Sequence, residues 1–218
     1  MKVLFVISTL GKGGAERVAS VLASRFAKDH ETYILKFDSK EPFYELDSRV
    51  KVRNLSQGVD DKGVIGNLKK RFDKIFDIRK VLKGGNFDIV ISFLDTTNIL
   101  TILANFGLNY KLIATEHNSY DLLDKKLFAF LRNLAYKKVD LLTVLSKSDL
   151  LYYSKFVKNC EVIYNPFFGN LTQNTDKENI ILSVARLEKV KGFDTMLKAL
   201  SKIDPKLLKE YKVLIAGD

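Results

Sequence analysis

The sequence predicts an α/β fold: a doubly wound parallel sheet, followed by the first part of a second domain of the same kind. Short apolar runs alternate with longer amphipathic stretches, and several of the runs are β-branched and almost continuous, as strands buried on both faces are. The alternation is interrupted once and then restarts. The 218 residues suit one complete domain and part of another, at about 150 residues each.

Eight apolar runs are predicted to be strands, and four stretches between them are predicted to be helices. The strands are expected at 3–8, 32–37, 88–94, 112–117, 141–146, 160–165, 179–185 and 212–217. The helices are expected at 15–28, 68–83, 122–138 and 193–202, where apolar side chains recur every three or four positions. Strands and helices that alternate in this way form parallel βαβ units.

A domain boundary is predicted after residue 165. Asn165 and Pro166 end the sixth run, and the stretch that follows is rich in Asn, Gly and Thr and lacks periodicity, which is typical of a linker. We therefore expect a first domain at 1–165, a linker at 166–178 and a partial second domain at 179–218. The last of these has room for roughly one βαβ unit, which takes about 30 residues.

Composition excludes several classes of protein. The chain is 46% hydrophobic and 28% charged, which excludes a disordered or collagen-like protein. Its one cysteine, Cys160, cannot form an internal disulfide, so a secreted disulfide scaffold is excluded and a reducing compartment is favoured. No apolar run approaches the length of a membrane-spanning helix, and the apolar start indicates a buried strand rather than a signal peptide.

The net charge of +10 favours an anionic partner: nucleic acid, an acidic membrane face or a phosphorylated ligand. The excess lies in 62–83 and 125–138, both amphipathic, and basic amphipathic helices are typical of membrane surfaces. Nucleic acid is not expected, since no RRM, KH or helix-turn-helix signature is present. The cations expected to contact an anionic membrane surface are Lys69, Lys70, Arg71 and Lys74. The alternative is a solvated helix that packs Phe72, Ile75 and Phe76 onto the domain.

A glycine-rich loop follows the first predicted strand and opens the first helix. Gly13 and Gly14 let a ligand approach the backbone, and the helix N-terminus offers N–H groups to an anion or to sugar oxygens. The loop is not a P-loop, because it has no Gly-Lys-Ser/Thr, and Glu16 replaces the third glycine of a dinucleotide-binding loop. The alternative is a tight structural turn.

Two further motifs follow predicted strands. His117, in Thr-Glu-His-Asn, is expected at the carboxyl edge of the sheet, where ligands of open α/β sheets bind. It could donate a hydrogen bond to a sugar hydroxyl or shuttle a proton near neutral pH, unless it is a satisfied structural histidine. Arg186 and Lys191 follow the seventh strand and could neutralise a diphosphate, unless they belong to a solvated loop.

No metal is expected at this site. The sequence has no Asp-x-Asp to hold a divalent ion on a nucleotide-sugar, and no cluster of His, Cys and carboxylates with metal-ligand spacing. Neutralisation by Lys and Arg would replace the metal.

Together these motifs resemble retaining glycosyltransferases of the GT-B fold in glycosyltransferase family 4. The segments that carry the resemblance are STLGKGGAERVASVLA, TEHN, VIYNPF, SVARLEKVKGFD and VLIAGD, and they cover essentially the whole chain. The stretch from FDIVISFLDTTNILTILAN to LIATEHNS resembles bacterial N-acetylgalactosamine transferases that extend lipid-linked glycans.

The resemblance implies an acceptor-side Rossmann-like domain at 1–165 and a donor-nucleotide domain from 179. Gly13 and Gly14 would lie near the donor phosphate, His117 would position the transferred sugar as the catalytic residue, and Arg186 and Lys191 would hold the donor diphosphate. The donor would be UDP-N-acetylgalactosamine, used as a substrate without metal or other cofactor. The acceptor would be an undecaprenyl-diphosphate-linked glycan, whose diphosphate Lys69, Lys70, Arg71 and Lys74 could also bind. Transfer would retain the anomeric configuration, at the inner face of the plasma membrane.

One family feature is not found. The family carries two glutamates eight positions apart in its C-terminal domain, but here Glu188 is followed at that spacing by Met196 and Glu210 by Asp218. The sequence therefore predicts a fragment that stops before this motif. The alternative function is a catalytically incompetent fragment that only binds the membrane or an anionic lipid-linked ligand.

Overall fold

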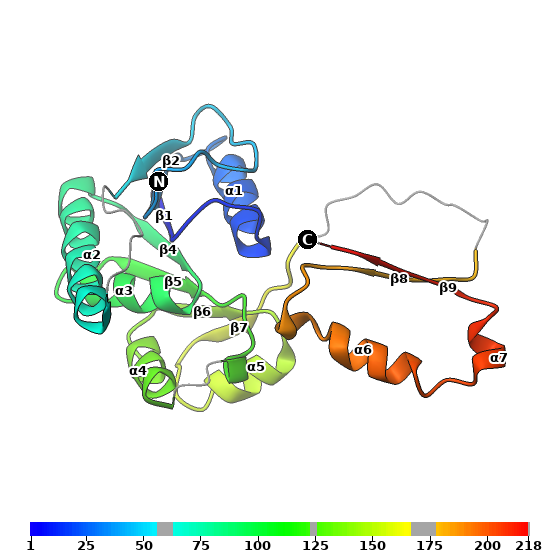
Figure 1. Cartoon of the computed structure of the whole chain (residues 1–218). Coiled ribbons are helices and arrows are strands. Elements are labelled where there is room, and N and C mark those ends of the chain that lie inside the picture. Colours follow the sequence, from blue (N-terminus) through cyan, green and yellow to red (C-terminus); the bar gives the residue numbers. More distant parts are fainter. Residues whose placement is uncertain (56–62, 123–125, 167–177, 218) are drawn as a thin grey trace. The chain divides into compact units, whose positions relative to one another are not determined.

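The computed structural model of the chain describes residues 1–55, 63–122, 126–166 and 178–217 (Figure 1). It divides into two compact units, Met1–Phe167 and Phe168–Asp218. The expected linker, 166–178, lies almost entirely outside the described residues.

The first unit is built on a seven-stranded parallel sheet, so the predicted doubly wound sheet is confirmed. The strand order is β3-β2-β1-β4-β5-β6-β7. The chain winds first from β1 toward the β3 edge and then, from β4 onward, toward the β7 edge. The strands are β1 (Lys2–Ile7), β2 (Glu31–Lys36), β3 (Lys51–Asn54), β4 (Ile89–Phe93), β5 (Lys111–Thr115), β6 (Leu141–Val144) and β7 (Cys160–Val162).

Helices cover both faces of this sheet. The helices are α1 (Gly14–Phe26), α2 (Gly63–Gly85), α3 (Asp95–Asn105), α4 (Lys126–Tyr136) and α5 (Lys147–Tyr153), with a 3-10 turn at Tyr120–Leu122. Alternate side chains of β1 enter two separate buried clusters. Phe5 packs in one with Ala19 of α1, and Leu4 packs in the other with Ile78 of α2 and Tyr136 of α4. The two faces of the sheet therefore bury two cores, as strands of a doubly wound sheet require.

Several elements differ from the sequence prediction. The pattern did not predict β3, α3 or α5, and the strand expected at 160–165 ends at Val162. The helix expected at 68–83 runs longer, from Gly63 to Gly85. Residues 163–166, which were expected to end the sixth strand and begin the linker, instead leave the sheet and reach a pocket at its edge.

The second unit holds one βαβ arrangement. Its described elements are β8 (Ile180–Val184), a 3-10 turn at Lys189–Lys191, α6 (Phe193–Leu200), α7 (Pro205–Leu208) and β9 (Lys212–Ala216). Strands β8 and β9 pair in parallel, with Ile181 opposite Val213. None of the described residues from 178 to 217 is buried, and apolar side chains of both strands remain exposed.

Candidate functional site

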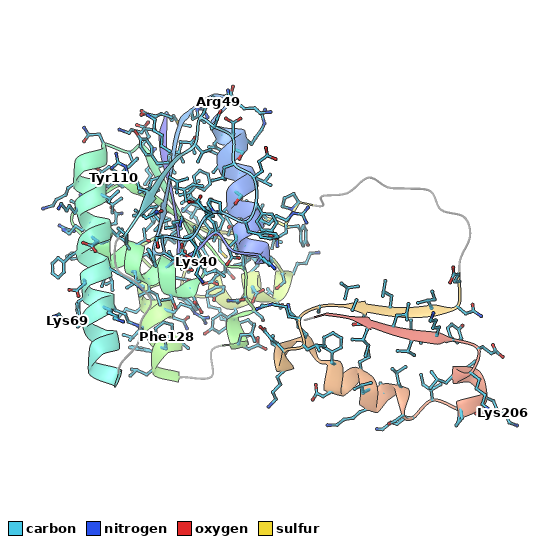
Figure 2. All side chains as sticks on the ribbon, turned by 45° about the horizontal axis from the view of Figure 1, so that its top comes forward. Lys40, Arg49, Lys69, Tyr110, Phe128 and Lys206 are labelled. Carbon is cyan, nitrogen blue, oxygen red and sulfur yellow. The ribbon has the colours of Figure 1, made fainter. Side chains whose placement is uncertain are left out.

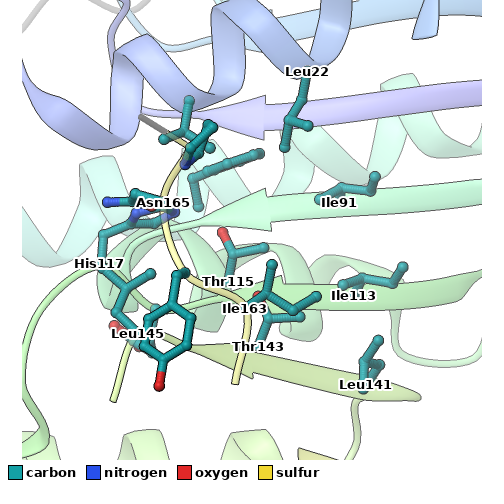
Figure 3. A pocket seen from close by; sticks show the side chains of 15 residues that line it. Leu22, Ile91, Ile113, Thr115, His117, Leu141, Thr143, Leu145, Ile163 and Asn165 are labelled. Atoms are coloured by element: carbon teal, nitrogen blue, oxygen red, sulfur yellow. The ribbon is translucent and has the colours of Figure 1, made fainter. Parts of the chain in front are cut away.

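A pocket of about 190 Å³ lies at the carboxyl ends of β4, β5 and β6 (Figure 3). Its lining includes Val18 and Leu22, which places it on the side of the sheet that α1 covers. The wall is mostly apolar, and Thr115, His117, Thr143 and Asn165 are among its polar residues. Figure 3 shows His117 and Asn165 at the same end of the pocket, with Ile113 and Leu141 farther along the strands. This edge is where ligands of open α/β sheets bind.

His117 is half-buried in this pocket, and its ring stacks on Phe93 of β4 with centroids 5.6 Å apart. Its Nδ1 atom is buried and has no hydrogen-bond partner among the described residues. Burial lowers the pKa of His117 to about 4, because the charged imidazolium loses its hydration. The imidazole is therefore neutral at physiological pH, where it can donate or accept a hydrogen bond but is a weak base. This does not fit a proton shuttle near neutral pH.

Glu116 points to the opposite face of the sheet, toward α3 and α4. Its carboxyl accepts a hydrogen bond from the hydroxyl of Tyr136, and the two side chains are buried. The Nδ2 atom of Asn98 donates to the Tyr136 hydroxyl at 3.0 Å and to the Thr115 carbonyl at 3.1 Å. Burial raises the pKa of Glu116 to about 8, although the Tyr136 hydrogen bond opposes the rise. Glu116 is therefore mostly protonated at neutral pH.

Sequence reasoning noticed the Thr-Glu-His-Asn segment but assigned Glu116 no role. Successive residues of an extended chain point to opposite faces of a sheet. This rule alone predicts that Glu116 and His117, just after a strand, face opposite sides. The partners of Glu116 come from α3 and α4, and no local pattern links Asn98 or Tyr136 to residue 116.

The glycine-rich loop forms the start of α1. Gly14 is the first helical residue, and a Cβ atom there would meet open space. At Gly13 a Cβ atom would collide with the carboxylate of Glu16, so this acidic side chain lies at the helix N-terminus. The first turn thus offers backbone N–H donors together with one carboxylate acceptor, a set suited to sugar hydroxyl groups. Neither glycine lines the pocket, whereas Val18 and Leu22 of the same helix do.

The loop that follows β2 holds this glycine-rich loop in place. The Phe43 backbone N–H donates to the Leu10 carbonyl at 2.8 Å, and the Tyr44 hydroxyl donates to the Lys12 carbonyl at 3.0 Å. Lys12 also places its ammonium 5.3 Å from the centre of the Phe43 ring. The backbone carbonyls of the loop are therefore bonded to the fold, which fixes its course past α1.

Arg186 and Lys191 lie in the second unit, between β8 and α6. Arg186 is 64% exposed and forms an ion pair of 2.6 Å with Glu188, while Lys191 is exposed at the end of the 3-10 turn. Gly192 follows with φ of 70°, a left-handed conformation that favours glycine, and α6 starts directly after it. The glycines and His117 belong to the first unit, so a common site for all five residues stays a prediction.

The basic residues of α2 divide between two environments. Lys69 is exposed and Lys70 is half-buried. Arg71 places its guanidinium 5.5 Å from the centre of the Phe128 ring, and Lys74 places its ammonium 5.3 Å from that of Phe37. These two cations therefore lie against aromatic rings of neighbouring segments.

The expectation that Phe72, Ile75 and Phe76 of α2 pack onto the domain is wrong for the two phenylalanines. Phe72 and Phe76 are 60% and 67% exposed, so these rings do not pack onto the domain. The helix is held instead by Ile78 and Leu82, both fully buried, with Ile75 packed beside them.

Among the described residues, no group of three or more His, Cys, Asp or Glu side chains is arranged to hold a metal ion.

Two family models together match most of the chain. Residues 12–167 match the family model described as Glycosyltransferase Family 4, and residues 170–218 match that described as Glycosyl transferases group 1. Among solved structures, sucrose-phosphate synthase from Thermosynechococcus elongatus has a TM-score of 0.72 at 15% identity, covering 100% of this chain and 71% of that one. HepE from Anabaena in complex with UDP has a TM-score of 0.65 at 16% identity, covering 99% and 60%. These two likenesses concern the fold, and they confirm the expected fold class.

Two curated relatives come from Campylobacter jejuni. One is 42% identical over 222 residues and is named GalNAc-alpha-(1->4)-GalNAc-alpha-(1->3)-diNAcBac-PP-undecaprenol alpha-1,4-N-acetyl-D-galactosaminyltransferase. The other, N-acetylgalactosamine-N,N'-diacetylbacillosaminyl-diphospho-undecaprenol 4-alpha-N-acetylgalactosaminyltransferase, is 26% identical over 232 residues. The alignments take in 100% and 97% of this chain but only 62% and 61% of the relatives. Since one family model spans well over half of its residues, the chain belongs to glycosyltransferase family 4.

Proposed function

We propose that the protein transfers N-acetylgalactosamine from a UDP donor to a glycan on undecaprenyl diphosphate, with retention of the anomeric configuration. The observation that carries this proposal is the 42% identity, along the whole chain, to a Campylobacter transferase named for that sugar and that type of acceptor. The pocket at the carboxyl edge of the sheet, with His117 in its wall, supplies a place for the sugar.

The protonation states at the pocket support a reaction without a protein base. His117 is neutral but weakly basic, and Glu116 already carries its proton at neutral pH. Neither group is suited to remove a proton from the acceptor hydroxyl. In a retaining transfer by front-face attack, the leaving phosphate oxygen of the donor takes that proton as the new glycosidic bond forms. His117 then positions the sugar through a hydrogen bond. Gly14 leaves room for the donor at the start of α1, and Gly13 precedes it with the Glu16 carboxylate beside it.

Arg186 and Lys191 supply positive charge for the donor diphosphate in place of a metal or other cofactor. Arg186 can give two parallel hydrogen bonds to a phosphate, and Lys191 acts as a point charge. The ion pair with Glu188 is exposed, and exposed pairs contribute about 0–1 kcal/mol. A doubly charged ligand can therefore displace Glu188 at low cost.

The membrane partner is proposed from α2. Lys69, Lys70, Arg71 and Lys74 lie on the same helix as the exposed rings of Phe72 and Phe76, a combination that suits an anionic membrane surface. Each cation near such a surface contributes about 1 kcal/mol. No helix within the described parts of the chain is both long and apolar enough to cross a bilayer. We therefore place the protein as a peripheral protein at the cytoplasmic face of the plasma membrane, with no nucleic-acid partner.

A transfer assay tests this function. The protein at its full natural length is incubated with a panel of UDP-sugars and the lipid-linked glycan, with and without EDTA. We expect product from UDP-N-acetylgalactosamine, insensitivity to EDTA and an α-anomeric proton in the NMR spectrum of the product. A β-linked product or loss of transfer in EDTA would contradict the retaining, metal-free reaction. No transfer from any UDP-sugar, with binding of the lipid-linked glycan preserved, would favour the binding-only alternative.

Variants of the second unit test the donor site. Arg186→Ala and Lys191→Ala are expected to raise the KM for the donor by about tenfold or more, because each removes a charged contact with the diphosphate. Lys198→Ala, an exposed lysine of α6, is the matched control and should leave that KM unchanged. If all three variants bind donor like the parent protein, Arg186 and Lys191 are not diphosphate ligands.

A further inference from the structure

An apolar trough runs along α3, beside α2 and α4. Figure 2 labels Lys69 on α2 and Phe128 on α4. It consists of two cavities, of about 210 Å³ and 590 Å³. The two share three lining residues, Ile99, Leu103 and Leu131, so they form one trough that follows the helix. It lies on the face of the sheet opposite α1 and the His117 pocket.

The trough exposes apolar surface that a helix in water would normally bury. Leu103, Leu131 and Leu134 are 48%, 45% and 52% exposed, and Phe106 is 77% exposed. Exposed apolar surface costs about 25 cal/mol per Å², so a contiguous strip of this kind marks a binding surface rather than scattered exposure.

A basic side chain lines each end of the trough. Among the described residues, no acidic side chain lines it. Arg71 and Thr96 line one end, and Lys138 lines the other. Since α3 begins directly after β4, the Arg71 end lies toward the carboxyl edge of the sheet, the edge that carries His117. Lys69 and Lys70 precede Arg71 on α2 but line neither cavity, so Arg71 is the cation that the trough presents at this end.

Two of the residues that line the trough, Asn105 and Phe106, have polar groups already bonded within the protein. Asn105 donates to the Tyr110 carbonyl at 2.9 Å and accepts from the Tyr110 N–H at 3.1 Å. Arg79 donates to the carbonyls of Ala104 and Phe106 at 2.8 and 2.6 Å, which caps the end of α3. A peptide laid in the trough would lose the hydration of its backbone N–H and C=O groups and find few partners. A hydrocarbon chain has no such groups to satisfy.

We propose that the α2–α3–α4 trough holds the hydrocarbon chain of the lipid-linked acceptor, with the anionic head of that lipid at the Arg71 end. The proposal rests on the proposed function for the identity of the acceptor. It adds a binding site for the chain itself, on the other face of the sheet from the sugar pocket. The trough's volume lies within the range of small-molecule sites, about 300–1,000 Å³.

A single tryptophan reporter tests the trough directly, since the natural sequence has no tryptophan. Phe106→Trp is titrated with farnesyl diphosphate, with inorganic pyrophosphate and with phosphatidylglycerol vesicles. We expect a saturable blue shift with farnesyl diphosphate and no blue shift with pyrophosphate. Leu151→Trp on α5, where residue 151 is 69% exposed and lines neither cavity, is the control reporter and should not respond to farnesyl diphosphate.

A second substitution shows whether the response comes from the trough. Leu103→Gln, added to Phe106→Trp, is expected to weaken farnesyl diphosphate binding by about tenfold, because it places an amide where both cavities meet. In transfer assays Leu103→Gln should raise the KM for the undecaprenyl-linked acceptor and leave the donor KM unchanged. Leu207→Gln, at a 53% exposed position of α7, is the matched control.

Three results would overturn the proposal: no response to farnesyl diphosphate, a response to phospholipid vesicles alone, or a dimer in light scattering that Leu103→Gln dissolves. The first excludes a bound chain, the second assigns the trough to bilayer lipid, and the third assigns it to a second copy of the protein. If farnesyl diphosphate binds as expected but the parent protein transfers no sugar, the proposed function fails while the chain site stands.

Discussion

Glu116 and His117 are neighbours in the chain, yet burial shifts their pKa values in opposite directions. Desolvation disfavours the charged form of each, so it raises the pKa of Glu116 to about 8 and lowers that of His117 to about 4. The charged and titratable groups around Glu116 are Asp95 of α3, Arg132 and Tyr136 of α4, and Tyr153 of α5. Both residues are therefore neutral in the folded protein at physiological pH, although an unfolded chain would ionise the glutamate.

This difference predicts how stability depends on pH. Between the ordinary pKa of 4.5 and the folded value of about 8, the folded protein keeps a proton on Glu116 that the unfolded chain has lost. Its contribution to stability is therefore fully present below pH 4.5 and is lost as the pH rises toward 8. Glu116→Gln should remove this dependence and unfold at higher urea concentration than the parent protein near pH 8.

Urea unfolding of parent and variant across this range is the measurement, with His117→Asn as the control. The effect of His117 on the pH dependence of stability has the opposite sign. Its folded pKa of about 4 lies below the ordinary 6.5, so its contribution to stability is lost as the pH falls from 6.5 toward 4. His117→Asn should therefore change the slope below pH 6.5 and leave the alkaline side unaltered. Equal slopes for Glu116→Gln and the parent protein would show that Glu116 is ionised when folded.

At the scale of single elements, the sequence predicted strands better than helices. A strand buried on both faces is a continuous apolar run, so β1, β4 and β5 are visible from their residues alone. Strand β3 is not, because its four residues at the sheet edge are all exposed and only Val52 is apolar. Its place depends on pairing with β2, from Tyr33 opposite Lys51 to Lys36 opposite Asn54.

Helix α3 escaped prediction because polar and apolar side chains share its buried face: Leu100, Ile102 and Ala104 are buried there together with polar residues. Thr97, Asn98 and Thr101 are buried against the sheet, whereas Leu103 is 48% exposed in the trough. Thr101 satisfies its hydroxyl by donating to the Thr97 carbonyl at 2.8 Å. A rule that places apolar residues inward misreads such a helix. Of the buried polar residues, Asn98 belongs to the Glu116 network through its hydrogen bond to Tyr136, and the exposed Leu103 lines the trough.

The junction of α2 with α3 gives a prediction at this scale. Arg79 holds the carbonyls of Ala104 and Phe106, which the helix itself leaves without partners. Arg79→Ala should lower the free energy of unfolding by about 1–3 kcal/mol, since both bonds are charge-assisted and the one to the Ala104 carbonyl is partly buried. Lys80→Ala, at the exposed neighbouring position, should change it by less than about 0.5 kcal/mol. A similar change for both variants in urea unfolding would refute the capping role of Arg79.

For the whole molecule, the sequence predicted the sheet class and a family that the comparisons confirm. It placed His117 correctly at the carboxyl edge, because the end of a buried strand fixes that position in a parallel sheet. It could not predict the trough, which depends on how three helices from separate parts of the chain lie together. It also missed the neutral state of His117, because the Phe93 ring and the apolar wall that desolvate it come from other strands.

The rate of sugar transfer by His117→Ala tests the central claim most directly. The account predicts a loss of about a hundredfold in kcat with UDP-N-acetylgalactosamine and the lipid-linked glycan, because the sugar is no longer held in position. His30→Ala removes the protein's other histidine, which packs on Phe26 away from the pocket, and should retain transfer within about twofold. If His117→Ala transfers sugar as fast as the parent protein and His30→Ala, the pocket at the carboxyl edge is not the site of the reaction.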